Sequence, residues 1–287
     1  MKQTSIAITS LHPFAGNPYQ VRDDAEMDAL VESIREYGVY TPLIVRPMEG
    51  QENEYEVISG HRRLHAAQKA GLSEVPALIY PLDRSAAAIA VVDNNLHREH
   101  ILPSEKAFAY KMKMGVLKKQ GRRTDLTSSQ IATKFNAAAQ IGADTGESRD
   151  QVYRYIRLTN LIPTLLRLVD EGRIAFSVAV ELSYLYQSTQ EHLAEIYDRD
   201  ETTPSYSQAV RMHRENGLSI EGISDERLEA IMAEQKPNQR KQIRLRRDDF
   251  SKFFPARYSD RQIRNDIMAG LDLLKRQRER SRDRDTR

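Results

Sequence analysis

The spacing of apolar residues predicts a mixed α/β region in the first hundred residues of the chain. Between Asp24, a favourable N-cap, and Gly38, a favourable helix end, apolar residues recur every three or four positions, as on one helix face. Residues before Gly16 lack periodicity, and we expect them to be loose. Alternating strands and helices indicate a compact α/β domain. The strand-like runs cover 43–46, 55–59 and 75–80, and the other helical runs cover 61–70 and 85–96.

After Pro103 the pattern is helical throughout, which predicts an all-α region behind the α/β domain. Each run carries apolar residues at helical spacing, and polar residues separate the runs. We expect helices at 104–119, 128–135, 137–145, 148–158, 163–171 and 175–186, with a polar break over 121–127.

The helices 137–145 and 148–158 flank a tight turn at Gly146–Glu147, and this spacing fits a helix-turn-helix. Ser148 and Gln151 also match a capping box at the start of the second helix. In such units the N-terminal residues of the second helix reach base edges in the major groove, whereas an ordinary charged helix face contacts only solvent. The predicted DNA-binding residues are Ser148, Arg149, Gln151 and Arg154 at the helix start, with Lys134 and Arg157 on phosphates.

The C-terminal region is less regular. Ser259 is expected to cap a helix whose apolar residues suit a partner helix, in the same chain or in a second subunit. Beyond Lys275 the sequence is charged without periodicity, and we expect disorder. The whole pattern predicts three domains, at 1–102, 103–218 and 219–287.

The four residues Gly60-His61-Arg62-Arg63 lie where a strand-like run meets a helical run. Glycine permits a tight turn there, and the free amides of a helix start form a ready anion site. Arg62 and Arg63 oppose the helix dipole in an isolated helix, by about 0.3–1 kcal/mol each. A bound phosphate would reverse that sign, so the pattern predicts phosphate binding; two solvated arginines are the alternative.

Composition narrows the choice of function. None of the 287 residues is cysteine, which excludes disulfides, thiolate metal sites and cysteine nucleophiles. The net charge of +2 is uneven, since 16 Lys and Arg stand against 8 Asp and Glu from Arg240 onward. That basic end suits a polyanion, or it is simply solvated. Histidines occur at metal-binding spacing, but their usual partner ligands are missing and we expect no histidine metal site.

Four segments in order resemble the ParB partition-protein family. Asn17–Arg22 comes first, Gly38–Pro47 is similar to the family's nucleoside-facing motif, Gly60–Arg63 to its phosphate motif, and Asn94–Arg98 to its third motif. The resemblance implies an α+β protein: a small mixed α/β ParB/sulfiredoxin-like domain, then an all-α helix-turn-helix domain and a small C-terminal region. A sulfiredoxin itself is excluded, because it needs a catalytic cysteine.

The family's N-terminal domain binds CTP between such motifs, so the resemblance implies CTP and Mg2+ as ligands, with Asn95 at the metal. Asn94 stands where the family usually has a glutamate tied to hydrolysis, so binding is better supported than turnover and any CTPase activity would be weak. The implied nucleotide-binding residues are Thr41, Pro42, Val45, Arg46, Gly60, His61, Arg62, Arg63, Asn94, Asn95 and Arg98.

The implied function is a CTP-dependent sliding clamp that partitions a plasmid, a chromosome or a mobile element. A homodimer would recognise a palindromic site in double-stranded DNA through its helix-turn-helix. Two other classes stay open: a nucleotide-dependent serine kinase or nuclease on the same fold, and a transcriptional regulator. A ParA-type ATPase is a candidate partner, although no run of Lys or Arg precedes Asn17. The expected location is the cytoplasm, on nucleoid or plasmid, with no membrane partner.

Overall fold

The structure is a computed structural model with two compact units, Met1–Glu234 and Gln235–Arg287. In α4 and α5 the side chains of 120–136, including that of Lys134, lie outside the described set. The described residues are 3–96, 98, 100–124, 130–218, 220, 222–234, 253–254 and 258–285.

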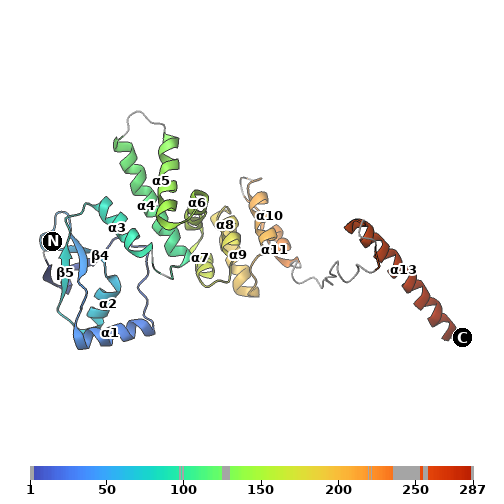
Figure 1. Ribbon diagram of the computed structural model, residues 1–287, viewed down its shortest axis with the longest axis horizontal. Helices are drawn as coiled ribbons and strands as arrows, with labels where there is room; N and C mark the ends of the chain where they lie inside the picture. Colours follow the sequence, from blue (N-terminus) through green and yellow to red (C-terminus); the bar gives the residue numbers. More distant parts are fainter. Residues whose placement is uncertain are drawn as a thin grey trace. The chain divides into compact units, whose positions relative to one another are not determined.

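A five-stranded mixed sheet organises the N-terminal part of the first unit (Figure 1). Its strands are β1 (Gln3–Ala7), β2 (Leu11–Pro13), β3 (Leu43–Pro47), β4 (Tyr55–Ser59) and β5 (Glu74–Ile79). The strand order is β1-β5-β3-β4-β2. The pairs β1/β5 and β3/β4 are antiparallel, whereas β3/β5 and β2/β4 are parallel.

The prediction that the residues before Gly16 are loose is wrong. They form β1, the 3-10 turn η1 (Ile8–Ser10) and β2, and they bury Ile6 and Leu11. Both strands are short, and their pairing partners lie far along the chain in β5 and β4. Because tertiary pairing rather than local propensity decides such strands, their own sequence carries little sign of them.

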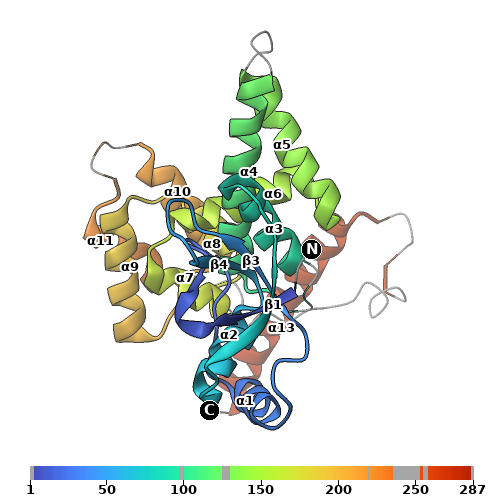
Figure 2. The ribbon, with the colours of Figure 1, turned by 90° about the vertical axis from the view of Figure 1, so that its left-hand side faces the viewer.

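Helices cover both faces of the sheet. Val57 and Ile58 are adjacent in β4, point to opposite faces and are both fully buried. Helices α1 (Ala25–Tyr37) and α2 (His61–Ala70) pack over Val57 and lie together in Figures 1 and 2, whereas α3 (Arg84–Leu96) packs over Ile58.

The start of α1 confirms the predicted cap. The Asp24 carboxylate accepts a hydrogen bond from the Met27 amide at 2.8 Å, and this bond holds the pKa of Asp24 below its usual value. Gly38 ends the helix.

The rest of the first unit is helical, as predicted. Two details differ: α4 continues to Thr124, into the expected break over 121–127, and one helix, α5, replaces the two expected at 128–135 and 137–145. Tyr110 and Met114 of α4 pack against Ile141 of α5, and this tertiary contact overrides local polarity. The elements are α4 (Pro103–Thr124), α5 (Gln130–Thr145), α6 (Arg149–Arg157), η2 (Leu158–Asn160), α7 (Pro163–Asp170), α8 (Phe176–Leu182), α9 (Gln187–Asp200), α10 (Tyr206–Asn216) and α11 (Asp225–Ala233).

Helix α4 takes part in three hydrophobic clusters at once. Ala109 packs with the core around α3 and Ile58, Tyr110 with the core of α5 and α6, and Ala107 with the core of the later helices. The α/β part and the helix-turn-helix are therefore joined by a shared helix rather than by a linker.

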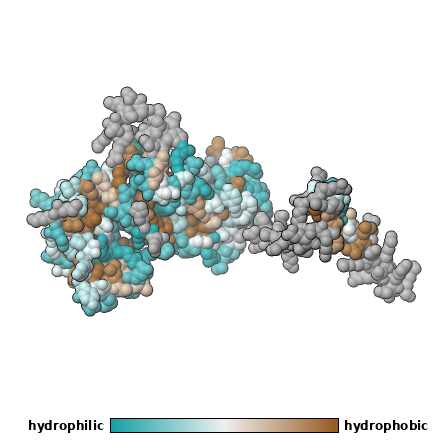
Figure 3. Space-filling model, in the orientation of Figure 1, coloured by the Kyte–Doolittle hydropathy of each residue, from teal (hydrophilic) through white to brown (hydrophobic). Residues whose placement is uncertain are grey.

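In the second unit, α13 (Asp260–Asp285) begins after Ser259, whose hydroxyl accepts a hydrogen bond from the Gln262 amide at 3.4 Å. The prediction of disorder beyond Lys275 is wrong, because the helix continues to Asp285. That stretch is rich in Arg and also contains Gln and Glu, and all three are strong helix formers. Apolar side chains stay exposed on this helix: Met268, Leu271, Leu273 and Leu274. Figure 3 shows brown, hydrophobic surface in this second unit.

Within the described parts of the chain, no helix has the length and apolar character needed to cross a bilayer.

Candidate functional site

Gly60 makes the turn between β4 and α2. Its backbone is left-handed, with φ 103°, and an added Cβ would lie 3.1 Å from Leu43 Cγ. Any other residue would therefore meet both backbone strain and crowding. The first turn of α2 contains no acidic residue, so its free amides remain suited to an anion, as the sequence predicts.

A cavity of about 170 Å3 opens beside this turn. None of the nine residues that line it is acidic, and Arg62 and Arg98 are basic, so the cavity favours an anion. Three of the four sequence motifs meet here. The lining residues are Asn17, Tyr19, Gln20, Val21, Gly60, His61, Arg62, Asn95 and Arg98.

Four of these residues, Asn17, Tyr19, Gln20 and Val21, were not among the predicted ligands. Their motif was recognised in the sequence, but nothing local to it shows that it folds against α2 and α3. Two bonds hold it there: the Tyr19 hydroxyl donates to the Val92 carbonyl at 3.3 Å, and the Gln20 amide donates to Glu105 at 2.9 Å.

The two predicted phosphate arginines have different surroundings. Arg62 Nη2 lies 3.4 Å from carboxylate oxygens of both Asp24 and Glu26, at the long end of hydrogen-bond distances. Arg63 donates to the main-chain carbonyls of Thr41 and Pro42, the latter at 2.9 Å. Burial also lowers the pKa of the Arg63 guanidinium. Arg63 therefore ties α2 to the segment before β3, while Arg62 lines the cavity.

His61 is a neutral side chain in the wall of the cavity. Burial lowers its pKa to about 4, against smaller opposing effects from a hydrogen bond to Val57 and from Glu56. One ring nitrogen, Nε2, accepts a hydrogen bond from the Phe14 amide at 3.4 Å. The imidazole thus joins the start of α2 to the segment after β2 and supplies no positive charge near pH 7.

The predicted nucleoside-facing residues do not line this cavity. Val45 is fully buried in the core. Arg46 is also buried, and its Nε donates at 2.7 Å to Glu56, which accepts a second bond from the Ala15 amide at 2.8 Å. Thr41 is exposed and its carbonyl accepts a hydrogen bond from Arg63, and Pro42 is half-buried. The structure therefore gives Val45 and Arg46 a role in holding the sheet together.

The third motif lies at the end of α3. Asn95 and Arg98 line the cavity, whereas Asn94 is exposed and outside it. Asn95 donates to the Val91 carbonyl at 2.8 Å. Asp93 is 2.6 Å from the Lys113 ammonium. His97 and Glu99 lie outside the described residues.

Metal ligands are scarce in the described part of the chain: it contains no group of three or more His, Asp or Glu side chains placed to hold an ion. A divalent ion here would depend on oxygens supplied by a ligand, with Asn95 as the predicted protein contact.

Close contact between α5 and the turn after it shapes the helix-turn-helix. A Cβ at Gly142 would lie 2.4 Å from the Glu147 carbonyl oxygen, and the Glu147 amide donates to the Gly142 carbonyl at 2.9 Å. Gly146 has φ 71°, which suits glycine. The two glycines set how closely α6 follows α5.

The start of α6 presents the predicted base-reading residues. The Ser148 hydroxyl accepts from the Gln151 amide at 3.1 Å, as predicted for half of the capping box. Arg149 and Arg154 are exposed, and Gln151 is half-buried and accepts from Arg154 at 3.4 Å. Val152 is fully buried, which fixes this polar face outward.

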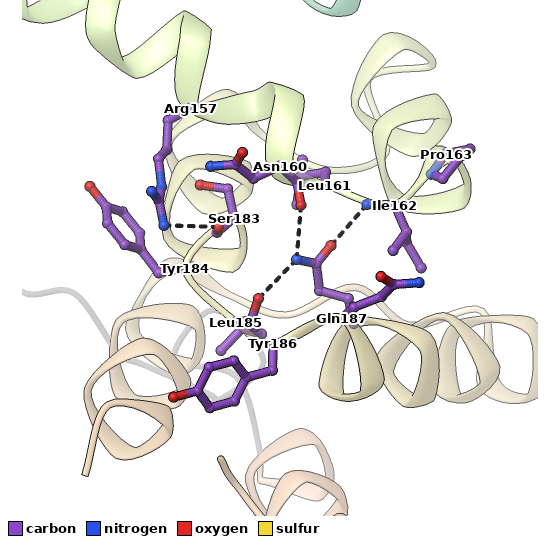
Figure 4. Close-up of a pocket in the computed structure, with 11 residues that line it drawn as sticks. Arg157, Asn160, Leu161, Ile162, Pro163, Ser183, Tyr184, Leu185, Tyr186 and Gln187 are labelled. Carbon is purple, nitrogen blue, oxygen red and sulfur yellow. Dashed lines mark hydrogen bonds between the residues drawn. The ribbon is translucent and has the colours of Figure 1, made fainter. Parts of the chain in front are cut away.

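Arg157, predicted to grip phosphate, is packed at the end of α6 (Figure 4). It donates to the Ser183 carbonyl at 3.1 Å, and its guanidinium lies 3.7 Å from the centre of the Tyr184 ring. These groups border a second cavity of about 490 Å3, where Gln190 accepts from the Ile162 amide at 2.9 Å. Arg157 therefore braces α6 against the turn after α8.

Comparison with known proteins agrees with the N-terminal motifs. The family model for the ParB N-terminal domain matches residues 2–96. The probable chromosome 1-partitioning protein ParB of Deinococcus radiodurans is 35% identical over 176 residues, 61% of this chain and 54% of that protein. Stage 0 sporulation protein J of Bacillus subtilis is 33% identical over 174 residues, 59% of this chain and 53% of that protein.

Among solved structures, a C-terminally truncated chromosome-partitioning protein ParB from Caulobacter crescentus, complexed with CTP-gamma-S, is 27% identical. It covers 68% of this chain and 98% of its own, with a TM-score of 0.32. The chain spans about half the length of the curated relatives it matches. Residues 2–96 therefore match the ParB N-terminal domain, and the chain is similar to chromosome-partitioning ParB proteins over 59–61% of its length.

Proposed function

We propose that the chain is a CTP-dependent DNA-binding protein of the ParB type, which acts in the partition of a DNA molecule. The observation that carries the proposal is the anion-favouring cavity in which Gly60, Arg62, Asn95 and Arg98 meet. Its motifs are those that bind CTP in this family, and a helix-turn-helix follows in the same compact unit.

The cavity suits the phosphates better than the whole nucleotide. Its volume of about 170 Å3 falls below the range of about 300–1,000 Å3 that is typical of ligand pockets. We therefore expect the triphosphate and its Mg2+ to occupy the cavity, and the nucleoside to lie outside it, toward the exposed Thr41. Arg46 and Arg63 would then hold the surrounding segments in place through Glu56 and the carbonyls of Thr41 and Pro42, without contacting the nucleotide.

We expect nucleotide turnover to be slow. Among the described residues that line the cavity none is a carboxylate, Asn94 cannot accept a proton as a carboxylate does, and Asp93 is paired with Lys113. General-base help is typically worth about 10²–10⁴-fold in rate. Bound CTP would act as a switch that depends on binding and release.

Two copies of the chain would bind a palindromic DNA site. The exposed Met268, Leu271, Leu273 and Leu274 on α13 support a dimer, because an apolar helix face of this kind suits a second helix.

The nucleotide part of the proposal predicts that Arg62→Ala weakens CTP binding by about 10- to 100-fold, because one charge-assisted contact contributes about 1.5–3 kcal/mol. Titration of labelled CTP, ATP and GTP with and without duplex DNA measures both affinity and base preference. Arg35→Ala is the matched control, since Arg35 is an exposed arginine on α1 that pairs with Glu32. Equal CTP affinity in Arg62→Ala and wild type would remove Arg62 from the site.

The DNA part predicts that Arg149→Ala and Gln151→Ala each reduce discrimination between a selected site and random duplex by about 1–3 kcal/mol. A site chosen by the wild-type protein from a random library serves as the probe. Arg199→Ala is the control, since Arg199 lies on α9 and pairs with Asp200. Arg157→Ala is a poorer probe, because it also removes packing against Tyr184. Variants at Arg149 and Gln151 that still select the same site would exclude α6 as the reading helix.

A further inference from the structure

Lys113 is a buried cation at the junction of three helices. It lies on α4 and is only 2% exposed. Its ammonium nitrogen is 2.6 Å from Asp93 Oδ1 on α3 and 2.6 Å from Asp144 Oδ2 on α5. One ammonium group therefore bridges two carboxylates from helices on opposite sides of α4.

The two carboxylates lie near different sites. Asp93 immediately precedes Asn94 and lies two residues before Asn95, which lines the candidate nucleotide cavity. Asp144 lies at the end of α5, two residues before Gly146, where the chain turns into α6. The bridge thus links the residue before the third motif to the end of α5, next to the turn of the helix-turn-helix.

Other residues of α4 contact either the loop that lines the cavity or the turn between α5 and α6. Glu105 is 6% exposed and accepts the Gln20 amide, which belongs to the loop that lines the cavity. Lys106 pairs with Glu147 in the helix-turn-helix turn, and the Tyr110 hydroxyl donates to the same carboxylate at 3.1 Å. Among these contacts, only those of Lys113 join α3 directly to α5.

Removing one partner from such a bridge is unfavourable. A buried ammonium needs its carboxylates, because an unpaired charge in the protein interior loses hydration without compensation. Burial opposes the charge on Lys113, yet the hydrogen bonds to Asp144 and Asp93 hold its pKa above the usual value. If α3 shifts when a ligand occupies the cavity, the shared ammonium of Lys113 would therefore transmit that displacement to α5.

We propose that Lys113 is a positioning residue that couples nucleotide binding at the cavity to DNA binding at the helix-turn-helix. This inference rests on the proposed function and adds to it the side chain through which the two sites communicate. Coupling of this kind is reciprocal: DNA changes the affinity for the nucleotide by the same factor as the nucleotide changes the affinity for DNA.

The test removes the bridge without leaving an unpaired charge. In the triple variant Lys113→Met, Asp93→Asn, Asp144→Asn, all three charges are absent, and such neutral replacements are commonly tolerated by the fold. CTP affinity is measured with and without the DNA site selected by the wild-type protein. Asp144→Asn, which keeps Lys113 paired with Asp93, is the milder second variant. Lys111→Met is the control on the same helix, since its ammonium donates to the Thr159 hydroxyl at 3.0 Å.

In the wild type and in Lys111→Met we expect DNA to change CTP affinity by about 5- to 150-fold, the usual range for coupled sites. In the triple variant we expect that factor to fall to about 2-fold or less, with CTP affinity in the absence of DNA nearly unchanged. Asp144→Asn should give an intermediate factor. A merely structural role would instead weaken both ligands and leave the factor unchanged.

Two results would overturn the inference in different ways. If the triple variant or, should that not fold, Asp144→Asn keeps the full coupling factor, Lys113 does not carry it, and the proposed function still stands. If the wild-type protein binds no nucleotide at all, the proposed function fails and this inference fails with it.

Discussion

Replacing Arg46 with methionine is expected to lower the free energy of unfolding by about 3–5 kcal/mol, because it leaves the carboxylate of Glu56 buried without its partner. The Arg46 and Glu56 side chains are 5% and 4% exposed, and their nitrogen and oxygen atoms lie 2.7 Å apart. Arg84, at 3.7 Å from the same carboxylate, can compensate only in part. Urea unfolding followed by circular dichroism measures the loss.

The compensating variant is Arg46→Met with Glu56→Gln. It removes both charges, and the glutamine oxygen can still accept the Ala15 amide, so most of the stability should return. The same double variant tests the predicted nucleotide role of Arg46. If Arg46 serves only to hold the strands, CTP affinity should match that of the wild type. A single variant as stable as the wild type would show that Glu56 is protonated or hydrated without Arg46.

Acidification is expected to destabilise the first unit through His61. The pKa of this ring is about 4 in the folded protein and about 6.5 when the chain is unfolded, so between these values the unfolded chain binds more protons. Its contribution is therefore present above pH 6.5 and is lost as the pH falls toward 4. The shift corresponds to at most about 3 kcal/mol.

The matched variant is His61→Gln, whose amide cannot titrate in this range. Carboxylates protonate over the same interval, so the useful quantity is the difference between the two curves of unfolding free energy against pH. We expect the wild-type curve to be steeper between pH 6.5 and 4. Parallel curves for wild type and His61→Gln would show that the ring is solvated.

Local signals in the sequence predicted much of the fold. Asp24 and Gly38 delimit α1 because caps are short-range features, and Gly60 marks its turn because only glycine relieves that backbone. The strands β1 and β2 escaped prediction because their partners, not their own residues, stabilise them. The sequence did not predict that α5 is one continuous helix, because the helix is stabilised by packing against Tyr110 and Met114 on α4.

The sequence predicted which kinds of residue form the candidate site, but not where each of them lies in the fold. A basic residue in a motif can line a cavity, as Arg62 does, or bind a carbonyl or carboxylate of its own chain, as Arg63, Arg46 and Arg157 do. The sequence does not distinguish these two roles of an arginine, because both suit a planar cation with many hydrogen-bond donors. Only the folded arrangement separates them.

The hydrogen bond from the Gln20 amide to Glu105 has a practical consequence for any fragment of the protein. A fragment that stops at residue 96, where the family match ends, would lose Arg98 of the third motif and the Glu105 carboxylate that anchors the Asn17–Arg22 loop. It would also lose Ala109, which packs beside Tyr19 and Val92. In such a fragment the Asn17–Arg22 loop would be held less firmly beside the cavity, so its nucleotide affinity would differ from that of the full chain. A fragment meant to reproduce the nucleotide affinity of the full chain must therefore extend through α4.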